Sequence, residues 1–368
     1  MNITEIILYK APVKLKVPFK ISLGTFDYAN NILVVIKTSS PYIGYGECSP
    51  FMTIHGESID TAFTVGQYLA KQLIGKPALD IAQLSADMDS VIYGNTCIKS
   101  AFNIALYDLA AQHAQVPLYR FLGGTNNKIL QTDYTISIDT PEKMARDAVS
   151  IVQNGFKIIK VKLGGTKELD CERIRLIREA VGKEVLLRID ANQGWNVQTA
   201  IETLQALAQY TIQHCEEPIP RWLYTELPVV RAASPIPIMA DESCFDQHDA
   251  KRLIDIHACD LFNIKLSKSS GISRALKIID LAEAASMKIQ MGGFLESRLG
   301  FTAAAHVALT SNRIEHIDFD TPLMFTEDPV TGGITYGKNG VVTVPESVGL
   351  GASYDQAYLE KQTKIIIH

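Results

Sequence analysis

The sequence predicts an α/β fold, in which a parallel (β/α)7β barrel, a modified TIM barrel, carries an α+β capping domain. Short apolar runs alternate with helical patterns from residue 130 onward. Five of these runs end in ionisable residues that follow one another at intervals of 24 to 28 residues. One strand, one helix and two loops take about that many residues in a barrel of roughly 250 residues. Before residue 125 the pattern differs, with strands first and helices after, which predicts the cap.

Composition and charge limit the possible partners. A hydrophobic content of 47% and a charged content of 20% are ordinary for a globular protein. A net charge of −5 without a basic cluster argues against nucleic acid, and no apolar run is long enough for a membrane span. Residues 1–5 lack a signal-peptide pattern, and the six cysteines are scattered without a CxxC pair. We therefore expect reduced thiols and a cytoplasmic location.

Residues 1 to about 50 are expected to form an antiparallel meander. Its strands would be Ile3–Tyr9, Asn31–Lys37 and Ile43–Cys48, which are bounded by turn residues. We interpret Lys16–Asn30 and Ser49–Gly56 as loops. Because both carry many apolar residues, we expect them to cover another part of the molecule.

Three helical patterns complete the cap, at Ser58–Leu73, Asp80–Tyr93 and Thr96–Gln115. Small apolar residues line one face of the third, including Ala101 and Ala105. This stripe predicts close packing against a neighbouring element. We expect the capping domain to span residues 1–125.

Eight strand-like runs and seven intervening helical patterns predict the barrel, over residues 126–320. Pro141–Gln153 and Gly271–Ala285 are examples of the helices. No helix follows the eighth run. Glycines at 332–340 instead predict a hairpin, and we expect residues 321–368 to return to the cap. The predicted strands are 130–136, 157–162, 185–190, 211–216, 236–241, 260–265, 288–293 and 314–319.

Three carboxylates, Asp190, Glu216 and Asp241, end consecutive predicted strands. Three anions at one barrel mouth repel one another unless a cation lies between them. Oxygen ligands without His or Cys suit a hard ion, so we expect Mg²⁺ first and Mn²⁺ second. The alternative, helix caps or solvated loop carboxylates, explains one such residue better than three in series.

Lysines stand on both sides of these carboxylates. Lys160 and Lys162 end the second predicted strand, and Lys265 ends the sixth. A lysine beside a bound cation and a second lysine should lose basicity, which suits proton transfer near neutral pH. The alternative is surface lysines that extend over apolar stems. Lys162 and Lys265 on opposite walls could remove a proton from one face of a carbon acid and return it to the other, which is an epimerisation.

The order KxK, DAN, EEP, ADES and NIKxxK resembles the enolase superfamily, muconate lactonising subgroup. The resemblance covers essentially the whole chain. It implies a cap-plus-barrel fold and proton transfer through an enediolate that a metal ion stabilises. The residues that it implies are Asp190, Glu216 and Asp241 for Mg²⁺, Lys162 and Lys265 for proton transfer, and Lys160 for neutralising the substrate carboxylate.

Asp318 and Asp320 end the eighth predicted strand. This DxD resembles the dipeptide epimerases, in which it holds the N-terminal ammonium group of the dipeptide. Muconate and succinylbenzoate carry no such cation, so the motif favours an epimerase. Asp133–Thr135 is also similar, which implies that Thr135 contacts the substrate. Glu296, after the seventh strand, is expected only to orient its neighbours.

Two positions depart from the Ala-Glu epimerases. Gly24 stands where those enzymes have an arginine, and Phe294, next to Gly293, stands where they have a small residue. We expect Gly24, Gly293 and Phe294 to line the pocket for the second residue of the substrate. Burying an unpaired glutamate there would be costly, so we expect neutral dipeptides such as Ala-Ala or Ala-hydrophobic.

The expected activity is therefore a Mg²⁺-dependent dipeptide epimerase, an isomerase that inverts the α-carbon of the C-terminal residue. One alternative is another enzyme of the subgroup: a cycloisomerase, an o-succinylbenzoate synthase or an N-acylamino acid racemase. A different class would be a catalytically silent barrel that binds peptides. The two lysines argue against it, because binding alone needs no base on each face. The sequence leaves open the exact dipeptide and whether the chain forms a homo-oligomer.

Overall fold

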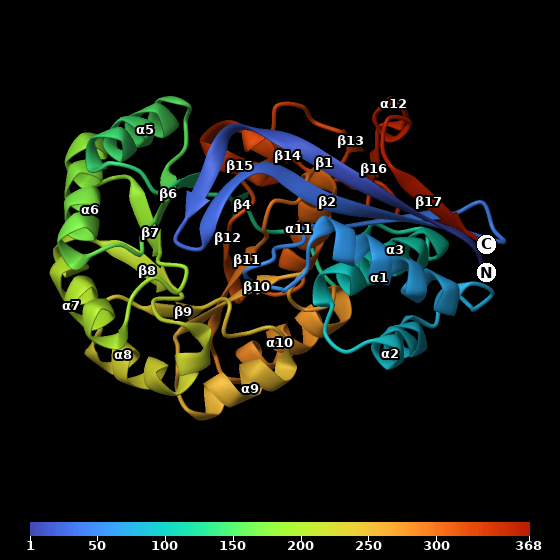
Figure 1. The fold of residues 1–368 in the computed structure, drawn as a ribbon, viewed down its shortest axis with the longest axis horizontal. Helices are drawn as coiled ribbons and strands as arrows, with labels where there is room; N and C mark the ends of the chain where they lie inside the picture. Colours follow the sequence, from blue (N-terminus) through green and yellow to red (C-terminus); the bar gives the residue numbers. More distant parts are fainter.

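Eight parallel strands form the predicted barrel in the computed structural model, which describes residues 1–368 (Figure 1). The strands follow one another in chain order, and each lies within one predicted run. The fold-class prediction is thus confirmed. The barrel strands are β5 (Tyr134–Ile136), β6 (Ile158–Lys162), β7 (Leu186–Asp190), β8 (Ile212–Glu216), β9 (Ile238–Ala240), β10 (Leu261–Lys265), β11 (Lys288–Gly292) and β12 (Ile314–Ile317).

Seven helices curve around the outside of these strands (Figure 1). Most begin at a polar side chain that accepts a hydrogen bond from the first helical turn, as Thr140 does before α5 and Asn196 before α7. Because each helix follows a strand, the carboxyl ends of the strands and the starts of the helices lie at the same edge of the barrel. The helices are α5 (Pro141–Gln153), α6 (Lys167–Val181), α7 (Val197–Leu207), α8 (Leu227–Ala233), α9 (Gln247–Asp255), α10 (Ile272–Ala284) and α11 (Arg298–Ala308).

The cap is a four-stranded antiparallel sheet covered by helices. Its order is β17 (Lys364–Ile367), β1 (Ile3–Ile21), β2 (Gly24–Thr38) and β3 (Ile43–Cys48). The C-terminal strand β17 pairs with β1, which places the two chain ends together (Figure 1). The helices are α1 (Ile59–Leu73), α2 (Ile81–Val91) and α3 (Thr96–His113).

Small residues allow α3 to approach β3 closely. A Cβ atom at Gly46 would collide with the carbonyl oxygen of Ala101, and one at Gly44 with that of Ala105. The predicted packing role of the small-residue stripe is therefore confirmed. A hydrophobic core of 23 buried residues lies between the cap sheet and its helices. A larger core of 79 buried residues fills the barrel and includes the other face of the cap sheet, through residues such as Tyr9 and Leu33, so the cap packs on the barrel through a shared apolar interior.

The prediction that Lys16–Asn30 forms a loop is wrong. β1 and β2 extend through this segment as one long hairpin that turns at Ser22 and Leu23. A register shift between Lys14 and Phe19 breaks the alternation of buried and exposed residues. The sequence pattern therefore did not indicate strands in this segment. At this bulge Leu15 forms a bridge with Phe325, beyond β12. The hairpin is thus anchored to the barrel near the end of its last strand.

The second predicted loop, Ser49–Gly56, is irregular as expected and lies over the barrel. Phe51 and Ile54 are buried, and the Phe51 ring lies 5.3 Å from that of Phe294. Arg221 donates a hydrogen bond of 2.7 Å to the carbonyl oxygen of Ile54. The loop therefore contributes an apolar roof over the strand ends.

Short elements complete the chain, and the predicted hairpin forms between β14 and β15. β15 also pairs with β4, at the start of the barrel. No helix has the length and hydropathy needed to cross a membrane. The short elements are α4 (Leu118–Phe121), β4 (Leu130–Gln131), β13 (Val330–Gly332), β14 (Thr335–Tyr336), β15 (Val341–Thr343), β16 (Ala352–Tyr354) and α12 (Gln356–Leu359).

Candidate active site

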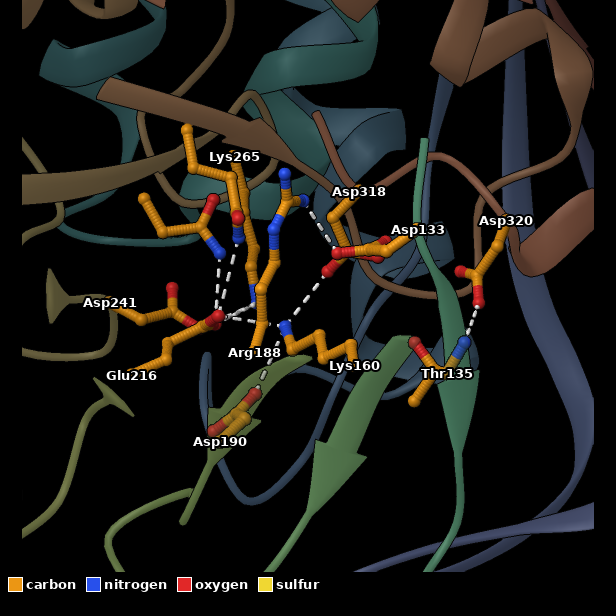
Figure 2. Close-up of polar contacts among 12 residues, drawn as sticks. Asp133, Thr135, Lys160, Arg188, Asp190, Glu216, Asp241, Lys265, Asp318 and Asp320 are labelled. Atoms are coloured by element: carbon orange, nitrogen blue, oxygen red, sulfur yellow. Dashed lines mark hydrogen bonds and ion pairs between the residues drawn. The ribbon is translucent and has the colours of Figure 1, made fainter. Parts of the chain in front are cut away.

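The predicted metal and lysine residues converge at the carboxyl ends of the barrel strands (Figure 2). All are buried, and main-chain register places Lys162 beside Asp190 and Asp190 beside Glu216. Lys162 on β6 and Lys265 on β10 are four strands apart in an eight-stranded barrel. They therefore approach the centre of the mouth from opposite walls, as the sequence predicts.

Ammonium groups lie between the carboxylates. Lys162 Nζ is 2.6 Å from Asp190 Oδ2, and Lys265 Nζ is 2.6 Å from Asp241 Oδ2. Lys160 Nζ is 3.1 Å from Asp190 Oδ2 and 2.8 Å from Glu216 Oε2. Each carboxylate is thus held by at least one cation in a site that excludes water.

These contacts shift the pKa values of the three carboxyl groups in different directions. Burial and the charge of Asp190 raise the pKa of Glu216 to about 8. Burial opposes ionisation of Asp190 too, but Lys162 and Lys160 hold its pKa below the ordinary value. Lys265 and Lys268 do the same for Asp241, against the effect of burial. Glu216 is consequently the carboxylate most in need of a further cation near neutral pH.

The expectation that Lys265 loses basicity beside a bound cation stays a prediction. Burial lowers the pKa of Lys265, but the charges of Asp241 and Glu216 outweigh burial and raise it above the ordinary value. The expectation assumed a divalent cation at the same carboxylates. Without that positive charge, the carboxylates stabilise the ammonium form.

The donor set fits a hard divalent cation. Asp190, Glu216 and Asp241 supply only oxygen, with no sulfur or imidazole among them. In this side-chain arrangement no three acidic, histidine or cysteine side chains are grouped to hold a metal. Lys160 lies between Asp190 and Glu216, and Lys265 Nζ lies 3.8 Å from Glu216 Oε1 as well as beside Asp241. One ammonium group therefore lies between Asp190 and Glu216, and another lies between Glu216 and Asp241, so both positions attract positive charge.

Asp318, Asp320 and Thr135 form the opposite end of the site. Lys160 Nζ is 2.8 Å from Asp318 Oδ2, and the Thr135 amide donates to Asp320 Oδ2 at 2.5 Å (Figure 2). Against burial, Lys160 lowers the pKa of Asp318 to about 2. Burial and the charge of Asp318 raise the pKa of Asp320 to about 7. A second cation placed here would ionise Asp320 fully.

A cavity of about 40 Å³ lies between the lysines and the Asp318–Asp320 end of the site, beneath the cap hairpin and the loop of Ser49–Gly56. A volume this small holds little more than one water molecule, so the covering segments or the lysines must move to admit a substrate. Gly24 lies outside the lining, at the hairpin tip, where its Cβ position would be 3.6 Å from the Phe26 ring. The predicted residues that line the cavity are Thr135, Lys160, Lys162, Lys265, Gly293, Phe294, Asp318 and Asp320.

Phe294 and Glu296 shape the wall beside Lys265. The Lys265 ammonium lies 4.6 Å from the centre of the Phe294 ring, over its face. Glu296 Oε2 accepts a hydrogen bond of 2.5 Å from the Phe294 amide, and Glu296 Oε1 accepts one of 2.6 Å from Ser267 Oγ. These contacts are consistent with the orienting role expected for Glu296.

The sequence did not single out Lys268 and Asn192, which also support the site. Lys268 is fully buried and donates to Asp241 Oδ1 at 2.5 Å. Asn192 Oδ1 accepts a hydrogen bond of 3.0 Å from Lys162 Nζ. Both residues belong to the motifs DAN and NIKxxK, so the motif spacing was the signal that could have identified them.

Two family descriptions match most of the chain. Residues 3–123 match the mandelate racemase / muconate lactonizing enzyme N-terminal domain, and residues 143–358 match the enolase C-terminal domain-like description. A D-Ala-D/L-Ala epimerase from Cytophaga hutchinsonii is 68% identical over 368 residues, which is 100% of both chains. A hydrophobic dipeptide epimerase from Enterococcus faecalis is 38% identical over 355 residues, which is 96% of this chain and 100% of that one.

Solved structures agree with these similarities. The dipeptide epimerase from Cytophaga hutchinsonii, in complex with Mg and D-Ala-L-Val, has a TM-score of 1.00 and covers 100% of both chains. The Enterococcus faecalis dipeptide epimerase, in complex with Mg and L-Leu-L-Tyr, has a TM-score of 0.93 at 38% identity and covers 96% of this chain and 100% of its own. The chain therefore belongs to the mandelate racemase and muconate lactonizing enzyme family of the enolase superfamily.

Proposed function

We propose that this protein is a Mg²⁺-dependent dipeptide epimerase that inverts the α-carbon of the C-terminal residue. The observation that carries the proposal is the placement of Lys162 and Lys265 on opposite walls of one buried cavity. The two relatives described above, both named as dipeptide epimerases, support it. The preferred substrate has an N-terminal Ala and a small neutral or hydrophobic second residue.

The two lysines carry the proton transfer in this proposal. One lysine in its neutral form removes the α-proton from one face of the substrate, and an enediolate forms. The other lysine, as its ammonium form, returns a proton to the opposite face. Because either lysine can begin, the enzyme converts both epimers.

Asp190, Glu216 and Asp241 would hold Mg²⁺, with Mn²⁺ as a second choice. The cation, when bound, supplies positive charge that stabilises the developing charge on the substrate carboxylate. It also lowers the basicity of Lys265, because it takes over the negative charge that now raises the lysine pKa. Lys160 would add a second positive charge toward the same carboxylate.

Asp318 and Asp320 would bind the N-terminal ammonium group of the dipeptide. We expect a free amino acid to be too short to reach both this ammonium site and the metal-binding carboxylates. Phe294 gives the second side chain an apolar wall beside Gly293. No arginine lines the cavity, and its three lysines, Lys160, Lys162 and Lys265, already have other roles in this proposal, so none is left to pair with a glutamate side chain. This favours neutral second residues.

A cycloisomerase, an o-succinylbenzoate synthase or an N-acylamino acid racemase would not need the ammonium site, and a silent peptide-binding barrel would not need two lysines. We therefore rank these alternatives below the epimerase. The proposal also includes a cytoplasmic location, which the six unpaired cysteines support.

The test is ¹H NMR of dipeptides incubated with the enzyme and Mg²⁺ in D₂O. We expect α-deuterium at the C-terminal residue of Ala-Ala and conversion between its epimers. Lys162→Ala and Lys265→Ala should each abolish conversion, while each still exchanges the α-proton of one epimer. Lys99→Ala is the control, because Lys99 is a buried lysine of the cap that pairs with Asp89 at 2.9 Å. Normal epimerisation by either active-site variant would refute the two-base mechanism.

A further inference from the structure

The side chain of Arg188 crosses the barrel interior toward the gap between its last and first strands. Arg188 lies on β7 and is only 2% exposed. Its Nη1 donates to Asp133 Oδ2 at 2.7 Å (Figure 2). The same nitrogen donates to the carbonyl oxygen of Ile317 at 3.0 Å. Asp133 immediately precedes β5, and Ile317 is the last residue of β12. One guanidinium group therefore holds the two ends of the barrel sheet together.

We call this closure the seam, and it consists of residues 132–135 and 317–320. The seam has little regular strand pairing. The main chains form a single isolated bridge between Thr132 and Ile317. Side chains supply the other links. Phe319 N donates to Thr132 Oγ1 at 2.8 Å, and Thr135 N donates to the Asp320 carboxylate. The arginine contacts are the charged part of this set, and charge-assisted hydrogen bonds are the stronger kind.

Both carboxylates of the ammonium site belong to the seam. Asp318 directly follows the residue whose carbonyl Arg188 holds, and Asp320 is linked across the seam to Thr135. Arg188 also neutralises Asp133, a third buried seam carboxylate. Burial and the charge of Asp318 raise the pKa of Asp133, and Arg188 opposes them. Without Arg188, the Asp133 carboxyl would lose its charged hydrogen-bond partner and remain buried beside Asp318, which would disturb both sides of the seam.

We propose that Arg188 is a positioning residue for recognition of the substrate ammonium group. It acts through the seam and does not line the cavity, so it does not touch the substrate. A planar guanidinium can bind the Asp133 carboxylate and the Ile317 carbonyl at once, while the remaining nitrogens bond to Gln213 and His316. Lysine has one nitrogen and cannot replace this geometry. The inference rests on the proposed function, because it concerns the ammonium group of a dipeptide.

The experiment compares Ala-Ala with N-acetyl-Ala-Ala, which keeps the reacting carboxylate and lacks the ammonium group. For each enzyme, kcat and KM are measured for Ala-Ala, and the dissociation constants of both compounds are measured by calorimetry with Mg²⁺ present. We expect Arg188→Met to raise KM for Ala-Ala at least tenfold with a smaller change in kcat. The preference for the free amine in binding should fall by the same factor. Arg188→Lys should recover only part of it.

Two further variants complete the test. Arg178→Met is the matched control, because Arg178 is a buried arginine that donates only to main-chain carbonyl groups, which lie before β7 and β8. It should leave the amine preference unchanged. If Arg188→Met does not fold, the double variant Arg188→Met/Asp133→Asn replaces the carboxyl group that Arg188→Met leaves without its partner, and it should show the same loss of preference.

The outcomes separate the two claims. An unchanged amine preference in folded Arg188 variants, or an equal loss in Arg178→Met, would overturn the positioning role while wild-type epimerisation leaves the proposed function standing. A wild-type enzyme that epimerises no dipeptide would overturn the proposed function, and this inference with it.

Discussion

Lys160 shows how one residue can serve two ends of a site. Its ammonium group lies within 3.1 Å of Asp190, Glu216 and Asp318, which belong to the proposed metal and ammonium sites. A divalent cation between Asp190 and Glu216 would compete with Lys160 for these oxygens. Lys160 would then remain with Asp318, close to the substrate carboxylate. Lys160 thus balances part of the negative charge at both ends of the site.

The first prediction at the residue scale concerns Asp241. Asp241→Asn should weaken Mg²⁺ binding at least tenfold, about 1.4 kcal/mol, because it removes one of three anionic ligands. Calorimetric titration with Mg²⁺ measures this directly, without reference to activity. Asp249→Asn is the control, since Asp249 is an acid on α9 that pairs with Arg252. Equal Mg²⁺ affinity in the wild type and Asp241→Asn would contradict the ligand assignment.

At the scale of elements, the tip of the cap hairpin carries Gly24, whose role in specificity stays a prediction because the residue lies outside the cavity lining. Gly24 has a φ of 150°, a conformation that residues with a Cβ atom rarely adopt. An arginine at this position would therefore strain the hairpin tip in addition to supplying charge.

The second prediction follows from this strain. Gly24→Arg should raise kcat/KM for Ala-Glu relative to Ala-Ala and should lower the thermal midpoint by a few degrees, corresponding to about 1–3 kcal/mol of backbone strain. Gly24→Ala separates the two effects, because it should lower the midpoint similarly without changing the substrate ratio. A wild-type preference for Ala-Glu of tenfold or more would show that the pocket accepts an anion without arginine.

Glu47 joins β3 of the cap to the start of α11 and to β16. Its buried carboxylate accepts hydrogen bonds from Asn31 Nδ2 at 2.8 Å, Ser297 N at 2.9 Å, Gly300 N at 2.8 Å and Tyr354 Oη at 2.7 Å. The cap and the loop that carries Phe294 and Glu296 are therefore fixed relative to each other by one side chain.

The third prediction tests that connection. Glu47→Gln should destabilise the protein by about 2–3 kcal/mol, because the amide nitrogen would face donors and leave buried groups unpaired. Denaturant titration of both proteins gives the difference. Glu5→Gln, at a partly exposed carboxylate of the cap, should change stability by less than about 1 kcal/mol. Equal effects of the two substitutions would refute the role of Glu47.

These elements also show what the sequence could and could not predict. Barrel strands are identifiable because each apolar run ends in a charged residue, as at Asp190 and Lys265. The hairpin was missed because a bulge at residues 15–18 interrupts its alternation. The pairing of Arg188 with Asp133 was missed for another reason, since 55 residues separate the partners and only barrel closure brings them together.

At the scale of the whole molecule, buried histidines couple stability to pH. His306 Nδ1 accepts a hydrogen bond of 3.1 Å from Tyr119 N, and its Nε2 lies 3.0 Å from the Leu350 carbonyl oxygen. Burial lowers the pKa of His306 to about 4, below the unfolded value of about 6.5. The unfolded chain therefore binds a proton more readily, and the stability contributed by neutral His306 is lost as pH falls from about 6.5 toward 4.

The fourth prediction isolates this contribution. Between pH 7 and pH 5, wild-type stability should fall by about 2 kcal/mol more than that of His306→Gln, which keeps a donor and an acceptor but cannot titrate. Denaturant titrations at both pH values provide the four free energies. Other ionisable groups cancel in the difference. Parallel pH profiles for the two proteins would show that His306 does not carry the proton linkage.

The pairing of β17 with β1 has a consequence for how the protein is made. Tyr9 pairs with Lys364, so 355 residues separate the two partners along the chain. At about 5–20 residues per second, a ribosome needs about 20–70 s to synthesise that distance. During this time β1 has no neighbour on one side, and an unpaired strand edge is a template for association with other chains. The cap begins to emerge first and is completed last, which makes the nascent chain a client for chaperones that shield strand edges.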